Sequence, residues 1–212
     1  MVQLDNLLQP LGLETFGWFE MFNGPNELAG KSAALIGNRG RAMWDAFSHS
    51  ECANDGEKNP LDRWTKANIS PIANELNAVA LYPFLDNSDQ HWPFQQWAKT
   101  ATGLQQAPQG MLIDPKYGLW HAFRTVLVFE EQIEFVEPAE VVHPCEQCVD
   151  KPCLATCPVS AIAIGRFDAN ICIDHVLSDR GDACSSQGCI ARNACPVGRE
   201  YAYSTEQQAF HM

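Results

Sequence analysis

The sequence predicts an α+β domain followed by a small cysteine-rich domain, and three observations carry this prediction. Helical and strand patterns intermix through residues 1–136, as they do in mixed folds. All six tryptophans lie before residue 145, whereas eight of the nine cysteines lie from Cys145 onward. We therefore expect a first domain over residues 1–136 with an aromatic core, a proline-flanked linker over 137–144, and a second domain over 145–212 that its cysteines hold together.

Helices of the first domain are predicted from apolar residues at helical spacing and from proline at a first helical position. Apolar residues at this spacing mark three segments: residues 4–12, 43–47 and 94–101. Asn59-Pro60 and Ser70-Pro71 each have the form of an N-cap followed by proline, so we expect one helix from Pro60 and another from Pro71 to Asn77.

Strands are predicted where short apolar or aromatic runs end at turn residues. These runs are residues 16–22, 32–36, 78–82, 110–113 and 119–129. The last two are separated by Asp114-Pro115-Lys116-Tyr117-Gly118, in which proline and glycine favour a turn. Strand, turn and strand are therefore expected over residues 110–129.

Charge and hydropathy narrow the classes of function. The chain has 14 basic and 26 acidic side chains, a net charge of −12, which argues against nucleic acid or an anionic membrane as the main partner. No run approaches the roughly 18 apolar residues of a membrane span, and the first residues lack the basic start of a secretory signal. We expect a cytoplasmic protein, in which thiols stay reduced and clustered cysteines bind metal.

Eight cysteines form two blocks with a shared ending. The first block is Cys145-x2-Cys148-x4-Cys153-x3-Cys157, and the second is Cys172 followed by Cys184-x4-Cys189-x5-Cys195. Each block ends in Cys-Pro-Val. Cysteines at such spacing on a tight loop can turn their sulfurs to one centre while backbone N–H groups point at the same centre, an arrangement that stabilises an anionic iron–sulfur core.

This degenerate repeat resembles the two-cluster bacterial ferredoxins, in which the cysteine before proline binds the other cluster. The resemblance implies two [4Fe-4S] clusters with crossed ligands. One cluster would be held by Cys145, Cys148, Cys153 and Cys195, and the other by Cys157, Cys172, Cys184 and Cys189. The four-residue spacer before Cys153 and the looser second block depart from the simplest pattern, which leaves the partition of the last three cysteines open. The alternative is a structural protein with two four-cysteine zinc sites; Cys52 is expected to be a plain thiol.

The segment GMLIDPKYGLWHAFRTVLVF, residues 110–129, looks like the strand–turn–strand signature of the cobalamin-processing family exemplified by the methylmalonic aciduria and homocystinuria type C protein. It is also similar to the corresponding stretch of epoxyqueuosine reductases, whose second cysteine block begins with Cys-Ile, as Cys172-Ile173 does here. Those reductases and the reductive dehalogenases join a nitroreductase-like corrinoid domain to a two-cluster ferredoxin domain. The resemblance therefore implies a nitroreductase-like first domain and a ferredoxin-like iron–sulfur domain after it.

Candidate cofactor-binding residues of the first domain are Arg124, Trp120 and Tyr117. Arg124 lies within an apolar strand, and a buried guanidinium needs either an anionic ligand or an internal carboxylate. Epoxyqueuosine reductases carry a catalytic aspartate in a Phe-x-Asp pattern, to which Phe84-Leu85-Asp86 would correspond; the alternative is a plain turn.

Together these observations favour an iron–sulfur electron-transfer protein with two [4Fe-4S] clusters, which delivers electrons to a cofactor or partner at the first domain. The expected partner is a redox protein or a small-molecule acceptor, and a homodimer is possible because nitroreductase-like domains often dimerise. A corrinoid-dependent reductase, with cobalamin or FMN bound by the first domain, is the second hypothesis. A structural zinc protein is the third.

Overall fold

The structure, a computed structural model, describes residues 2–84 and 91–212. It divides into two units by contact: the first is Met1–Gly103 with His121–Glu140, and the second is Leu104–Trp120 with Val141–Met212. The expected linker region, 137–144, contains the last of three points at which the chain passes between units. Unlike the expected division, residues 104–120 belong with the cysteine region, because Ala107, Ile113 and Leu119 bury their side chains around Cys195.

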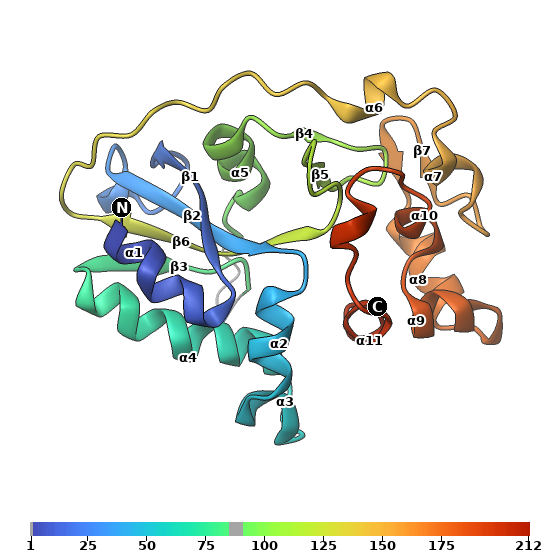
Figure 1. Cartoon of the computed structure of the whole chain (residues 1–212), viewed down its shortest axis with the longest axis horizontal. Helices are drawn as coiled ribbons and strands as arrows, with labels where there is room; N and C mark the ends of the chain where they lie inside the picture. The colour runs from blue at the N-terminus through green and yellow to red at the C-terminus, as the bar shows by residue number, and fades with distance from the viewer. Residues whose placement is uncertain (1, 85–90) are drawn as a thin grey trace. The chain divides into compact units, whose positions relative to one another are not determined.

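A four-stranded antiparallel sheet forms the centre of the first unit (Figure 1). Its strands, in spatial order, are β1 (Glu14–Glu20), β2 (Ser32–Arg39), β6 (His121–Phe129) and β3 (Ala78–Leu81). Neighbouring strands are antiparallel at every step, with Ala34 opposite Leu127 at the centre. Four of the predicted strands are thus confirmed, and β2 continues three residues beyond the predicted end.

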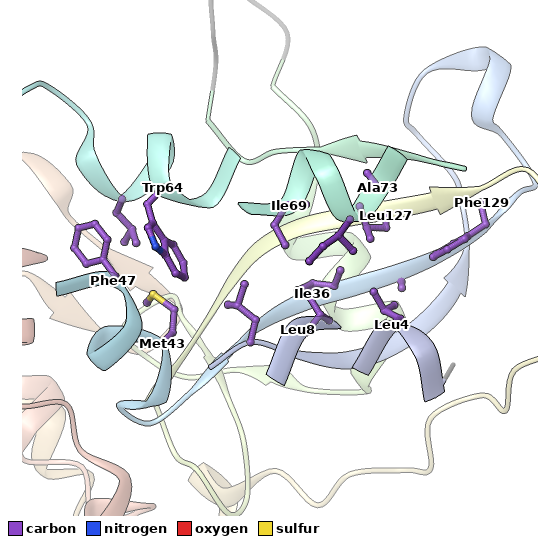
Figure 2. Close-up of a cluster of buried hydrophobic side chains, with 14 of the residues drawn as sticks. Leu4, Leu8, Ile36, Met43, Phe47, Trp64, Ile69, Ala73, Leu127 and Phe129 are labelled. Carbon is purple, nitrogen blue, oxygen red and sulfur yellow. The ribbon is translucent and has the colours of Figure 1, made fainter. Parts of the chain in front are cut away.

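Four helices precede β3 along the chain: α1 (Val2–Leu8), α2 (Ala42–Ser48), α3 (Glu51–Asn54) and α4 (Pro60–Glu75). Helices α1, α2 and α4 cover one face of the sheet, where Leu8, Phe47 and Trp64 pack with Ile36 and Leu127 (Figure 2). Helix α5 (Phe94–Thr102) lies on the other face, where the Trp97 ring stacks on Phe19 with 6.1 Å between centroids. Since both faces are covered, residues 33–36 of β2 are 0% exposed.

Helix α4 corrects one prediction. A single helix runs from Pro60 to Glu75 and contains Pro71, whereas the sequence suggested a new helix at that proline. Ile69, Ile72 and Ala73, on either side of it, are buried against the sheet. This burial outweighs the hydrogen bond that proline cannot donate.

The hairpin expected over residues 110–129 is also only partly present. The turn forms, since Asp114 and Gly118 exchange two backbone hydrogen bonds. The strand before it is β5 (Leu112–Ile113), which pairs with β4 (Gln105–Gln106) in the second unit, while β6 after it enters the sheet of the first unit. The two flanking strands therefore belong to different sheets.

The second unit consists of short elements joined by turns. Its helices are α6 (Pro144–Gln147), α7 (Pro152–Ala155), α8 (Ala169–Val176), α9 (Asp182–Gln187), α10 (Ile190–Asn193) and α11 (Thr205–Phe210), and its other strands are β7 (Ile162–Ala163) and β8 (Arg166–Phe167). Single 3-10 turns occur at Asp179–Gly181 and Arg199–Tyr201 in this unit, and at Gln9–Leu11 and Asn26–Leu28 in the first unit.

In the part of the chain that the structure describes, no helix has the length and apolar character needed to cross a membrane.

We predict that Ile36→Ala lowers the free energy of unfolding by about 2–5 kcal/mol, because Ile36 is 0% exposed and its removal leaves a cavity between the sheet and its helices. The matched control is Val79→Ala on β3, where the side chain is 41% exposed and the cost should stay below about 1 kcal/mol. Urea unfolding followed by tryptophan fluorescence measures both. Equal losses in the two variants would contradict this account of the core.

Candidate metal centre

Three cysteines that are close in the sequence and a fourth from far along the chain surround one cavity in the second unit. We call Cys145, Cys148, Cys153 and Cys195 the first cysteine group. The rest of the lining is mainly apolar and includes Ile113, Pro152, Pro196 and Val197. The structure thus brings together the four residues that the ferredoxin resemblance assigned to one cluster.

The effects of these cysteines on one another's pKa values show the same grouping. The pKa of the Cys145 thiol is raised to about 11, mainly by burial, with smaller contributions from Cys195, Cys153 and Cys148 in that order. Burial likewise raises the pKa of Cys153, with added contributions from Cys195 and Cys148. Without a bound cation the Cys145 and Cys153 thiols stay protonated at neutral pH, so metal binding would have to release their protons.

The remaining four ligand candidates form a second cysteine group: Cys157, Cys172, Cys184 and Cys189. Burial is the main cause that raises the pKa of Cys172, followed by Cys189, Cys157 and Cys184. Burial also raises the pKa of Cys189, and Cys184 and Cys157 add to that increase. Wherever another cysteine contributes to a raised pKa in these two groups, it is a member of the same group, in agreement with the crossed order.

All nine cysteines, Cys52 included, are free thiols. Among the residues that the structure describes, no three or more His, Cys, Asp or Glu side chains are gathered as ligands of one metal ion. Four thiolates on one zinc would each lie about 2.3 Å from it, whereas a four-iron cluster binds each thiolate to a different iron. The first group consists of neighbouring thiols around a cavity.

Backbone N–H groups point at several of these sulfurs. The Ala161 N–H donates to Cys157 Sγ at 3.3 Å. Hydrogen bonds from the N–H groups of Arg192 and Ala191 lower the pKa of Cys189, opposing the effect of its burial. Such donors stabilise a thiolate and an anionic cluster bound to it, as the loop spacing of the cysteines predicted.

Lys151 fixes the loop that carries Cys145 and Cys148. Its Nζ donates to the backbone carbonyls of both cysteines, each at 2.9 Å. The residue itself has a left-handed backbone with φ of 39°, which turns the chain directly into Pro152 and α7. The ammonium also lowers the pKa of Cys145, against the larger effect of burial.

Two glycines allow the 114–118 turn to pack against the chain that leaves Cys195. Gly118 and Gly198 both have positive φ, 59° and 68°. A Cβ on Gly118 would lie 2.0 Å from the Val197 carbonyl oxygen, and one on Gly198 would lie 2.3 Å from the Tyr117 carbonyl carbon. The approach is between backbones, so no side-chain movement can relieve it.

A scan against protein-family models finds no match, and a search of curated proteins finds none either. Solved structures do match. The epoxyqueuosine reductase of Streptococcus thermophilus superposes on 93% of this chain and 66% of its own, with a TM-score of 0.59 at 15% identity. That of Bacillus subtilis covers 98% of this chain and 68% of its own, with a TM-score of 0.57 at 14% identity.

A B12-trafficking protein CblC from C. elegans covers 99% of this chain and 90% of its own, with a TM-score of 0.57 at 15% identity. The chain shares the fold of these proteins. It spans about two thirds of the length of the epoxyqueuosine reductases that it matches. The mixed helix-and-strand fold of the chain is thus similar to the folds of both groups of proteins that residues 110–129 resembled.

Arg124, on β6 of the first unit, is half-buried. Its Nε donates to the Phe123 carbonyl at 3.4 Å. Burial raises the pKa of the Asp62 carboxyl on α4, and the Arg124 guanidinium opposes that rise. An internal carboxylate therefore faces the Arg124 charge, and a role toward an anionic ligand stays a prediction.

Tyr117 and Trp120, the other two candidate cofactor contacts, belong to the second unit. The Tyr117 ring packs on Tyr201 with 4.4 Å between centroids. Trp120 is 1% exposed and its ring is covered by Arg192 and Tyr203. Both are thus packed against aromatic partners within their own unit, and no cofactor contact follows from that packing. Asp86 lies outside the described residues.

The sequence interpretation missed Arg192 and Gln207. Gln207, on α11, is 0% exposed, and neither end of its amide has a hydrogen-bond partner among the described residues. No pattern in the sequence marks it. The signal that could have pointed to Arg192 is its place between two cysteines in an acidic chain.

We predict that Gly118→Ala lowers the free energy of unfolding by about 2–4 kcal/mol, since alanine adds both left-handed strain and a backbone collision. The matched control is Gly165→Ala, with a similar φ of +70° but nothing within 4 Å of the added Cβ; it should cost about 1 kcal/mol. Thermal unfolding followed by circular dichroism compares the two. A Gly118→Ala protein no less stable than the control would refute the close approach.

Proposed function

We propose that this chain is an iron–sulfur electron-transfer protein that reduces a corrinoid held by its first unit. The observation that carries the proposal is the division of eight cysteines into two groups of four, in the order expected of crossed ligation. The fold supports it, because similar structures include epoxyqueuosine reductases and a B12-trafficking protein.

The residues present fit two [4Fe-4S] clusters. The first cysteine group offers four thiols around a mainly apolar cavity, which would limit water access to a bound cluster. The second offers four thiols, two of which accept backbone hydrogen bonds. Bound there, the clusters would supply one-electron transfer; the chain would hold them, neutralise part of their charge and exclude water.

The zinc alternative is less favoured by the sequence, since both cysteine blocks end in Cys-Pro-Val, and a proline after the last cysteine is typical of the two-cluster ferredoxins. Nucleic acid is also not proposed as a partner. One epoxyqueuosine reductase of similar fold has been crystallised with a modified tRNA stem loop, but a net charge of −12 would repel a phosphate backbone. The proposed partner is a redox protein or a small-molecule acceptor.

Crossed ligation predicts that Cys195→Ser damages the cluster bound by Cys145, Cys148 and Cys153 and spares the other. Anaerobic iron and sulfide analysis with electron paramagnetic resonance measures the loss, and Cys52→Ser is the control that should keep both clusters. Loss of the signal from the second cysteine group instead would reverse the assignment. A colourless, zinc-loaded wild-type protein would refute the proposal of iron–sulfur clusters itself.

For the first unit, we expect hydroxocobalamin to bind the anaerobically purified protein at micromolar concentration, with a shift of the corrinoid absorbance. Arg124→Gln should weaken binding by about tenfold, the loss of one charge-assisted contact of about 1.4 kcal/mol. Arg180→Gln, which removes an exposed arginine from the other unit, should leave it unchanged. Tight binding of FMN in place of the corrinoid would identify a flavin reductase, and binding of neither would leave only electron transfer to an external acceptor.

A further inference from the structure

Lys151 holds its ammonium beside two members of the first cysteine group. Its Nζ lies 2.9 Å from the backbone carbonyl oxygen of Cys145 and 2.9 Å from that of Cys148. Within one cysteine, the carbonyl oxygen is at most about 5 Å from Sγ, so the ammonium lies within about 8 Å of both sulfurs. Lys151 also lines the cavity that the four thiols of this group surround. Two hydrogen bonds and the cavity wall therefore place the charge at the first group.

No carboxylate among the described residues forms an ion pair with Lys151, which is half-buried. The acidic residues nearest to it in the chain, Glu146 and Asp150, are exposed. The two backbone oxygens accept hydrogen bonds from the ammonium but bring no full negative charge. An anion in the adjacent cavity would therefore be its main charged partner.

The backbone of Lys151 indicates that a lysine side chain is needed at this position. Its φ of 39° lies in the left-handed region, which lysine seldom adopts and which glycine or asparagine adopts at lower cost. The turn between Cys148 and Cys153 could thus be made with less strain by another residue. A strained backbone beside a candidate site points to a function of the side chain that it carries.

We propose that Lys151 is a positioning residue, which holds Cys145 and Cys148 as ligands of the first-group cluster and raises the reduction potential of that cluster through its charge. This inference rests on the proposed function. Reduction adds one electron to the cluster and requires no proton, so the cluster becomes more negative by one unit. An ammonium at the wall of a mainly apolar cavity stabilises the reduced form more than the oxidised form, because such surroundings screen its charge weakly.

The test is an anaerobic redox titration of both clusters, followed by electron paramagnetic resonance, in the wild type, Lys151→Met, Lys151→Arg and Lys116→Met. Methionine is close to lysine in length and equally unsuited to a left-handed backbone, so Lys151→Met removes the ammonium and leaves the backbone strain as it is. Lys116→Met is the matched control, because Lys116 lies in the same unit, is exposed and lies outside the lining of the first-group cavity. The signal that Cys195→Ser lacks identifies the first-group cluster.

In Lys151→Met, the ratio of reduced to oxidised first-group cluster at a fixed potential should fall at least about tenfold, equal to about 59 mV for one electron. The ratio for the second-group cluster should change less than about threefold, as should both ratios in Lys116→Met. Lys151→Arg keeps the charge, so its first-group ratio should stay within about threefold of the wild type. A lysine that only fixed the loop would lower the iron content without moving the potential of the clusters that still form.

An unchanged first-group ratio in Lys151→Met, an equal change in both clusters, an equal change in Lys116→Met, or an arginine variant that behaves like methionine would each overturn the inference while leaving the clusters in place. If Lys151→Met does not assemble the first-group cluster, the arginine variant decides: a loaded protein with the wild-type ratio supports the inference, and a shifted ratio or a missing cluster refutes it. A wild-type protein without iron and sulfide would instead refute the proposed function, and this inference with it.

Discussion

The second unit depends on the convergence of Cys195 with three cysteines that lie far before it in the sequence. Its regular elements are short, and its apolar clusters are small and include the cysteines themselves. A metal that binds only the folded form of such a unit would add to its stability. The thiols are therefore both candidate ligands and part of the core, so the stability of this unit and its proposed chemistry depend on the same atoms.

The first unit has a different source of stability. Its sheet is covered on both faces, and aromatic side chains such as Trp64 and Trp97 fill the space between sheet and helices. Such a unit is expected to keep its fold when the cysteines of the other are substituted. This is why cluster loss and unfolding should be separable in cysteine variants of the whole chain.

Local sequence patterns were sufficient to predict the helices whose buried residues recur at the helical spacing. The helix over residues 94–101 is an example: Phe94, Trp97, Ala98 and Ala101 share a face and all are buried. The prediction of a new helix at Pro71 was wrong because the burial of neighbouring residues on the same helix outweighs the preference of proline for a first helical position. The assignment of residues 104–120 to the cysteine unit depends on packing against Cys195, which no local pattern contains. The cysteine groups followed from the resemblance to two-cluster ferredoxins, whereas the packing of Arg192 on Trp120 and Tyr203 depends on side chains that only the fold brings together.

The interleaving of the two units has a consequence for biosynthesis. Strand β6, which completes the central sheet, is translated before any of the eight clustered cysteines. The sheet of the first unit can therefore form before any of these eight cysteines has been synthesised. Residues 104–120 precede β6 in the chain, but the residues they pack against in the second unit are synthesised later. Cys195 is the last of the eight to be translated, so the first cysteine group stays incomplete until this segment has been synthesised.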